Sequence, residues 1–384
     1  MNALDDEAAA KPEAEPETEP VAAPAQPPAL PLTFRQELAP HLFKALRSGW
    51  SSALVGLPGG GLSNLLRFLA EPRVAAHYLG EDAAHTLLLY LEGDEALDPA
   101  ELPARLARQV PAAARRAHWP RAEQAALRRL VETTEPAGAL EAMLAFIQGM
   151  GHGRMVLVCD EFDAPLRAWP AADLRGLRRL RDEHKYHLAF VVGLRAEPAA
   201  LAAARGGESG PAKFAELFEA HTFPLRPYSQ DDARLALARK TVGWEQGLTP
   251  EQQDRLYRAS GGHPKLLMAG LVYLENRLHL SWSTVESGLA AEPGVLAACA
   301  AVWQALDPAE QAALWLLASE RRDDIPEPEL ARLAVRGLAV GDPPFVFASL
   351  LEGYVTRLPQ PDVAALTGPP RLSRLRDPSV KLYW

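Results

Sequence analysis

The chain has 384 residues, of which 48% are apolar, and its formal charge is −9. At about 150 residues per domain, this predicts two or three globular units and excludes a fibrous or wholly disordered protein. Residues 1–34 hold −6 of that charge, so the remainder lacks the net positive field that attracts nucleic acid or an anionic membrane. Two cysteines and no membrane-length apolar run predict a cytoplasmic protein without structural zinc or disulfides.

Both ends of the chain are predicted to be flexible. Residues 1–34 combine seven acidic residues with seven prolines, a composition that buries too little apolar surface to offset the entropy of ordering. We therefore predict a disordered acidic tail there. Residues 358–384 are also proline-rich and are predicted to form a flexible basic tail. Its basic residues include Arg371, Arg374, Arg376 and Lys381.

Between the tails, apolar runs alternate with helical patterns. The predicted strands are 52–55, 86–90, 155–159 and 188–192. The predicted helices are 34–48, 63–70, 174–182 and three across 99–150, broken near Pro111, Pro120 and Pro136. This alternation predicts an α/β fold in which a parallel sheet is flanked by helices. We assign this α/β domain to residues 35–228.

The chain beyond Arg195 is predicted to be mostly helical. Helical patterns cover 230–280 and 282–305. We therefore assign a helical lid domain to residues 229–305.

A strong helix start marks the next unit. Asp307 is expected to cap a helix, with Pro308 at its first position and Glu310 closing a capping box. The elements that follow are two helices and a short apolar run, at about 308–319, 327–336 and 345–347. This order predicts a winged-helix-like domain over residues 306–357.

A glycine-rich segment, GLPGGGLS at 56–63, lies between the first predicted strand and its helix. Glycines let consecutive backbone N–H groups turn toward an anion, and the helix N-terminus adds its positive dipole. The P-loop spacing G-x-x-x-x-G-K-[ST] is matched at Gly56, Gly61 and Ser63, but Leu62 occupies the lysine position. By itself, the segment equally suits a glycine-rich turn before a helix.

The missing lysine is expected to weaken phosphate binding without abolishing it. A hydrogen bond to a charged group contributes about 1.5 to 3 kcal/mol. Because that charge matters most as negative charge develops in the transition state, hydrolysis should suffer more than binding. Lys265 and Arg67 are the nearest candidates for a replacement cation, and the sequence favours neither.

Two carboxylates follow the third predicted strand, at the edge of an α/β sheet where ligands bind. Asp160 is a candidate ligand of Mg²⁺ together with the Ser63 hydroxyl, and Glu161 is a candidate to orient or deprotonate a water molecule. A solvated acidic turn is the structural alternative. Asp163 is expected to cap a helix or pair with an arginine such as Arg167.

Three further segments carry candidate residues. Arg195 follows the fourth predicted strand, where it either senses the terminal phosphate or neutralises the acids. Segment 261–264 predicts a sharp corner between two helices, and His263 and Pro264 are candidates to close over adenine or reach the phosphates. The arginines of 174–182 are expected on a solvated helix face, and an arginine finger toward a neighbouring subunit is the alternative.

The order of these motifs resembles the AAA-related STAND ATPases of bacteria, close to the origin-recognition-like group. The resemblance spans about 35–355 and rests on the glycine loop, CDEFD, LRRLRDEHKYHLAFVVGLR, FAELFEAHTFPLRPYSQDDA and SGGHPKLL. It implies a P-loop NTPase-like fold for the α/β domain at 35–228. It also implies ATP or ADP, with Mg²⁺, between the sheet and the lid. The nucleotide-binding candidates are then Gly56, Gly59, Gly60, Gly61, Leu62, Ser63, Asn64, His263 and Pro264. The catalytic candidates are Glu161 and Arg195, and the metal candidates are Ser63 and Asp160.

The leading hypothesis is a nucleotide-dependent switch with weak or absent hydrolysis. A slow ATPase that uses Glu161 is one alternative, and a nucleotide-free interaction protein or winged-helix DNA-binding regulator is another. The expected partner is an unidentified protein, and self-association is left open. DNA is not favoured, because Glu327 and Glu329 offset Arg332 and Arg336 on the second helix of the winged unit.

Overall fold

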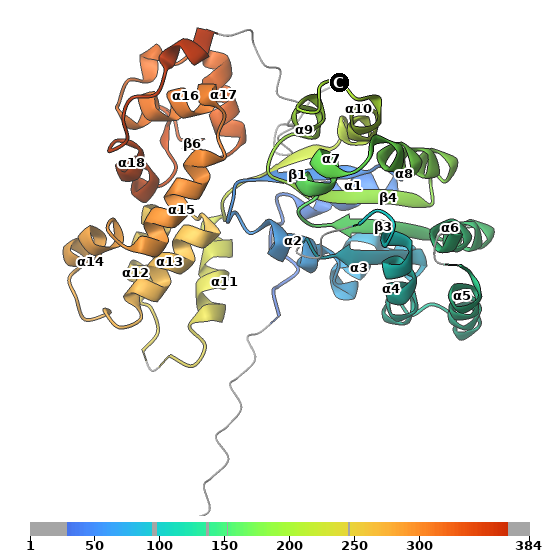
Figure 1. The fold of residues 1–384 in the computed structure, drawn as a ribbon. Helices are drawn as coiled ribbons and strands as arrows, with labels where there is room; N and C mark the ends of the chain where they lie inside the picture. The colour runs from blue at the N-terminus through green and yellow to red at the C-terminus, as the bar shows by residue number, and fades with distance from the viewer. Residues whose placement is uncertain (1–28, 94–97, 136–137, 152, 245, 368–384) are drawn as a thin grey trace, which may run out of the picture.

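Five parallel strands form the central sheet of the computed structural model, which describes residues 29–93, 98–135, 138–151, 153–244 and 246–367 (Figure 1). The strand order is β2-β3-β4-β1-β5. The strands are β1 (Ser52–Gly56), β2 (Thr86–Leu91), β3 (Arg154–Cys159), β4 (Leu188–Leu194) and β5 (Thr222–Leu225). This arrangement confirms the predicted P-loop NTPase-like α/β fold.

The strands are buried because helices cover both faces of the sheet. Every residue of β1 and β4 is buried, as expected for parallel strands between two helical layers. One face carries α1 (Ala39–Arg47), α2 (Leu62–Leu69) and α3 (Pro72–Leu79). The other carries α4 (Leu102–Arg116), α6 (Ala139–Gly149), α7 (Asp163–Ala168), α8 (Ala171–Glu183), α9 (Pro198–Ala203) and α10 (Ser209–Ala215), with α5 (Arg121–Thr133) against α4 and α6.

Two details of the sheet unit differ from the sequence prediction. The predicted break near Pro111 is wrong, because α4 continues through that residue. Burial of Leu106 and Val110 on the core face outweighs the single backbone hydrogen bond that proline removes. Strand β5 was not predicted, and it pairs only with β1, an edge position that tolerates Pro224. Pro136 lies outside the described residues.

Residues just before the predicted start of the α/β domain at residue 35 also pack against this domain. Phe34 is only 2% exposed and meets Phe68 edge-on, with ring centroids 5.2 Å apart. The Tyr78 hydroxyl donates a hydrogen bond to the Leu32 carbonyl. These contacts fix residues that the predicted tail 1–34 included, whereas residues 1–28 lie outside the described part of the chain.

The helices after the sheet stand beside it, in yellow to red in Figure 1. The first group is α11 (Gln230–Lys240), α12 (Pro250–Ser260), α13 (Pro264–Leu274), α14 (Trp282–Leu289) and α15 (Pro293–Gln304). The second group is α16 (Pro308–Ala318), α17 (Glu327–Val335), the antiparallel strands β6 (Ala339–Val340) and β7 (Phe345–Val346), and α18 (Ser349–Val355). We call them the lid and the C-terminal unit. The latter has the element order predicted for a winged helix, and its capping box at Asp307 and Glu310 is confirmed.

Short 3-10 helices complete the described elements, at Gly80–His85, Glu216–Phe218, Arg322–Asp324 and Val363–Thr367. The basic residues predicted for the C-terminal tail, beyond residue 367, lie outside the described residues.

Helices α14 and α15 form an apolar consecutive pair. No single helix in the described ranges is long and apolar enough to cross a membrane, and this pair meets that criterion only jointly, with a 53° bend between its members. Val295, Cys299 and Val302 are buried in the protein core, which explains the apolar composition of α15.

Candidate functional site

A cavity of about 350 Å³ lies where the glycine loop, the acidic end of β3 and the start of α13 meet. Its walls therefore come from segments that are far apart in the sequence. The residues that line it are Gly56, Leu57, Pro58, Gly59, Gly60, Gly61, Leu62, Ser63, Asn64, Asp160, Glu161, Asp163, Arg195, Pro264, Lys265 and Met268. Of the residues predicted to bind nucleotide or metal or to act in catalysis, only His263 is not part of this lining.

The glycine loop adopts a conformation that other residues resist. Gly59 and Gly61 have positive φ angles of 73° and 84°, and Gly61 is the N-cap of α2. A Cβ atom on Gly59 would lie 2.6 Å from the Cβ of Lys265, and one on Gly61 would lie 3.2 Å from Pro264. The loop therefore needs glycine both for its backbone and for the close approach of the lid. The N-terminus of α2 lies directly behind it, as an anion site requires.

Leu62, at the position of the missing lysine, packs against the sheet. A Cβ atom on Gly193 of β4 would lie 3.1 Å from a Leu62 methyl carbon and 2.7 Å from one of Leu66. The Leu62 side chain is half-buried and joins the apolar core below the loop. The cavity remains open beside it. The leucine therefore brings no charge to the site, and it lines the cavity without closing it.

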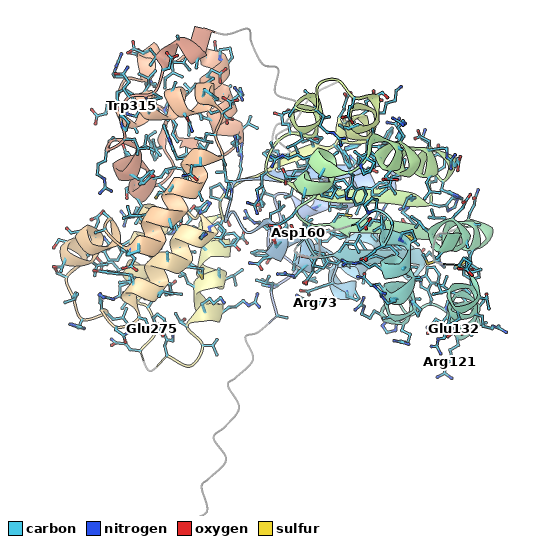
Figure 2. The ribbon with its side chains drawn as sticks, in the orientation of Figure 1. Arg73, Arg121, Glu132, Asp160, Glu275 and Trp315 are labelled. Carbon is cyan, nitrogen blue, oxygen red and sulfur yellow. The ribbon has the colours of Figure 1, made fainter. Side chains whose placement is uncertain are left out.

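Asp160 lies at the edge of the sheet that faces the lid, where Figure 2 labels it. It is 4% exposed, and its carboxylate accepts hydrogen bonds from the Tyr90 hydroxyl at 3.1 Å and from the Glu161 backbone N–H at 2.9 Å. Burial and then the charge of Asp160 raise the pKa of Tyr90, so its hydroxyl stays a donor. Tyr90 holds Asp160 in place from β2, a role that the sequence analysis missed.

The residues at this edge suit a magnesium ion that arrives with a phosphate ligand. Mg²⁺ is commonly held by one or two carboxylates, water and phosphate oxygens, and Asp160 and Ser63 line the same cavity. Within the described ranges, no group of three or more His, Cys, Asp and Glu side chains forms a metal site made by protein alone. The donor set therefore fits Mg²⁺ bound together with a nucleotide.

Glu161 and Arg195 form an ion pair at the cavity, with 2.7 Å between Oε1 and Nη2. Glu161 has a positive φ of 48°, an uncommon conformation that is often found at functional sites. Both side chains are about half exposed, so the pair contributes less than about 1 kcal/mol and separates at little cost. In the structure, Arg195 neutralises the charge of Glu161 at the end of β3. This contact corresponds to the predicted alternative in which Arg195 neutralises the acids.

Asp163 is held by the backbone beside that pair. Its carboxylate oxygens accept the Arg195 backbone N–H at 3.0 and 3.1 Å. Burial raises the pKa of Asp163, while this hydrogen bond and the charge of Arg167 act in the opposite direction. Asp163 therefore fixes the end of β4 relative to α7.

The start of α13 is bonded directly to the glycine loop. His263 Nε2 lies 3.1 Å from the Pro58 carbonyl oxygen, and the Lys265 backbone N–H donates to the Gly59 carbonyl at 3.1 Å. His263 Nδ1 accepts the Leu266 N–H and so caps the helix. These partners assign the proton to Nε2. His263 thus lies behind the loop and holds the lid against it, instead of facing the cavity as predicted.

This buried histidine predicts a pH-dependent stability. Burial lowers the pKa of His263 to about 4, whereas the unfolded chain takes up the proton near 6.5. Stability from this group is therefore complete above pH 6.5 and declines as the pH falls toward 4, by about 2 kcal/mol at pH 5. Urea unfolding at several pH values measures the slope. A His263→Asn variant, which keeps a capping acceptor, should show a shallower slope, and an equal slope would contradict the assignment.

The corner before His263 contacts both Tyr228, in the segment between β5 and α11, and the C-terminal unit. Gly261 has a φ of 57° and packs against Phe347, directly after β7, so closely that a Cβ atom would collide with its backbone and ring. Gly262 has a φ of 74° and packs on the Tyr228 carbonyl, while its own carbonyl accepts the Tyr228 N–H at 2.9 Å. The corner at 261–263 therefore lies between the glycine loop and Phe347 and contacts both.

The other candidate cations lie elsewhere. Arg67 pairs with Glu92 at 3.3 Å and is not among the residues that line the cavity. On α8, Arg178 pairs with Asp182, and the buried Arg181 donates to the Gly49 carbonyl. These two arginines are engaged within the sheet unit. The sequence also gave no signal for Met268, which enters the cavity one turn beyond Pro264.

The sheet order, the glycine loop and the acidic strand end together define a P-loop-type α/β fold. No protein-family model matches the chain, and no curated protein matches it. Among solved structures, it is similar to the ORC2 protein of Aeropyrum pernix described in ADPNP-ADP complexes (16% identity, 86% of this chain and 94% of that one, TM-score 0.49). It is also similar to a Walker-type ATPase of Pyrococcus abyssi (13% identity, 87% and 99%, TM-score 0.49).

Proposed function

We propose that the chain is an ATP- or ADP-binding switch, in which nucleotide and Mg²⁺ set the arrangement of the sheet unit, the lid and the C-terminal unit. The observation that carries this proposal is the shared cavity, whose floor is the glycine loop and whose other wall is the start of α13. A ligand there touches both units at once. Its occupancy therefore biases how the units are arranged, through its different affinity for each arrangement.

The proposed roles follow from the chemistry of the lining. Backbone N–H groups of the glycine loop and the N-terminus of α2 would bind phosphate oxygens. Asp160 and Ser63 would hold Mg²⁺, which neutralises phosphate charge when bound. Leu62 supplies no charge toward the transition state, so binding without efficient turnover is the expected behaviour. The motif order supports the proposal that the protein is STAND-like. The proposal also includes a protein partner and a cytoplasmic location.

Titration calorimetry with ATP and Mg²⁺ tests the proposal. We expect measurable binding, and we expect Asp160→Asn to weaken it about tenfold with Mg²⁺ present but little in EDTA, because the amide keeps the shape and loses the ionic metal ligand. Asp173→Asn, on α8 away from the cavity, is the control. Absence of heat at millimolar nucleotide, with folded protein confirmed, would exclude the switch. Nucleotide released on denaturation of purified protein would independently show occupancy.

Slow hydrolysis is the second candidate activity, and the Glu161–Arg195 pair favours it. A phosphate that draws Arg195 away would free the Glu161 carboxylate beside the cavity, where it can orient a water molecule. Release of inorganic phosphate by the purified protein measures this activity. Equal release by the Glu161→Gln variant would count against a role for Glu161 in hydrolysis.

The C-terminal unit is proposed to contact protein rather than DNA. On α17, Arg332 pairs with Glu329 at 2.7 Å and with Asp307 at 2.8 Å, and Arg336 pairs with Glu310. These guanidinium groups are committed to carboxylates of their own unit. A helix that binds DNA needs such charges for phosphates, so the observed pairing favours a protein partner.

A further inference from the structure

A second cavity, of about 1280 Å³, lies between the lid and the C-terminal unit. Its walls come from the segment between β5 and α11, from α11 and α12, and from the β6–β7 hairpin with the start of α18. We call it the interunit groove. Sites for small molecules commonly have about 300 to 1000 Å³, so a groove of this size suits a peptide segment.

The interunit groove combines exposed apolar side chains with an excess of carboxylates. On the hairpin, Phe345 is 56% exposed and Val340 is 38% exposed. Four carboxylates and two guanidinium groups also line the groove, those of Glu37, Asp231, Asp232, Glu352, Arg226 and Arg258. The lining therefore suits a segment that carries both basic and apolar side chains.

Two of the four carboxylates are available to such a segment. Asp232 accepts the Arg35 backbone N–H at 3.3 Å, and Glu37 pairs with the Arg35 guanidinium at 3.4 Å. The Asp231 side chain, in contrast, is 90% exposed, and its ion pair is long, at 3.7 Å. Glu352 forms no ion pair with another described residue, and burial raises its pKa. A cation beside Glu352 would therefore favour its charged form.

We propose that segment 368–384 of this chain docks in the interunit groove. The segment lies outside the described residues, and it has four basic side chains against the single acidic one of Asp377. Its larger apolar side chains are those of Leu372, Leu375, Val380, Leu382, Tyr383 and Trp384. The segment follows the 3-10 helix Val363–Thr367, which packs on α16 of the same unit. Its 17 residues can span about 56 Å, whereas a unit of this size has a radius of gyration of about 10 Å, so the segment reaches the groove.

Charge decides between this segment and the other candidate occupants. Segment 1–28 is close to the groove in sequence, because Thr33 lines it, but its seven acids against Lys11 would be repelled. The phosphates of DNA would meet the same repulsion. Gly261 and Phe347 both line the groove, so a docked segment holds the C-terminal unit against the lid. This contact does not require nucleotide.

Carbodiimide crosslinking of the whole chain tests the proposal, because the reagent joins a lysine amine to a carboxylate in contact with it. We expect Lys381 to be joined to Asp231 or Glu352 within one molecule, with a yield that falls at high salt. Asp323 is the control carboxylate. Its side chain is 93% exposed and has one arginine contact, as Asp231 has, but it does not line the groove. Crosslinks mainly to Asp323, to the acids of 1–28 or between two molecules would overturn the proposal.

Hydrogen exchange of the amides at 339–347 measures docking without a reagent. Replacing the three arginines of 368–384 with alanine should speed this exchange about 3- to 10-fold, because the docked segment covers the hairpin. Asp231→Asn combined with Glu352→Gln should act similarly and add nothing to the arginine variant, since both remove the same contact. Asp323→Asn should leave the exchange unchanged. Equal exchange in the parent and the arginine variant would contradict docking.

Discussion

Replacing Gly262 with alanine is expected to destabilise the lid by about 2 to 5 kcal/mol and to abolish the proposed nucleotide binding. The φ of 74° costs an alanine about 1 to 2 kcal/mol, and its Cβ would collide with the Tyr228 carbonyl oxygen, which adds about 1 to 3 kcal/mol of overpacking. Binding fails as well because the same corner positions His263 and Lys265 against the glycine loop.

Gly243→Ala provides the matched control for this substitution. Gly243 also has a positive φ, of 88°, but among the described residues, its two chain neighbours aside, none has an atom within 4 Å of the position of an added Cβ. The Gly243→Ala variant therefore has the backbone strain without the collision. Its free energy of unfolding should fall by only about 1 to 2 kcal/mol, and the proposed nucleotide binding should be retained. Urea unfolding and calorimetry measure both quantities. Equal losses in the two variants would show that the packing at the Tyr228 carbonyl contributes nothing.

Substitution of Glu310 by glutamine is expected to destabilise the C-terminal unit by about 3 to 5 kcal/mol. Glu310 is 3% exposed, and its carboxylate accepts Arg336 Nη1 at 2.5 Å and the Asp307 backbone N–H at 3.1 Å. Arg332 lies 3.4 Å away on its other side. Glutamine keeps the size but removes the carboxylate charge that pairs with the mostly buried Arg336, so this guanidinium loses its compensation, whereas Arg332 keeps its ion pairs with Glu329 and Asp307.

Hydrogen exchange of the α16 and α17 amides measures the effect where it arises. The same helices should keep their protection in Glu327→Gln, because that exposed glutamate in the first turn of α17 forms no ion pair with the other described residues. Unchanged exchange in Glu310→Gln would contradict the assigned energetic role of the buried network. Loss of protection that spread to the central sheet would show that the units unfold together.

Local patterns explain what the sequence predicted well. The capping box at Asp307 and Glu310 is formed by residues three apart, so its geometry is determined within one helical turn. Strands β1, β3 and β4 are continuous apolar runs in a parallel sheet, which is their usual signature. Strand β5 was not predicted, because it has only four residues, one of them a proline, and such a segment forms a strand only by pairing with β1.

Long-range packing explains what the sequence did not predict. The sequence favoured neither Lys265 nor Arg67 as the replacement cation, because the local sequence around each does not determine its long-range contacts. In the structure, α13 packs on Gly59, whereas Arg67 pairs with Glu92. The position of His263 behind the loop has the same origin. Its ring belongs to a contact between segments about two hundred residues apart, and only the folded chain brings them together.

The wedge formed by Gly261 and Phe347 gives the proposed switch a property that acts in both directions. Phe347 packs against Gly261, and the adjacent His263 is hydrogen-bonded to the glycine loop. A change at Phe347 can therefore reach the glycine loop directly, without passing through the central strands. Suppose that a partner protein displaces the C-terminal unit and thereby changes the affinity for nucleotide by some factor. By thermodynamic reciprocity, nucleotide then changes the affinity for that partner protein by the same factor. In the proposed switch, retention of nucleotide would thereby report whether the proposed protein partner is bound.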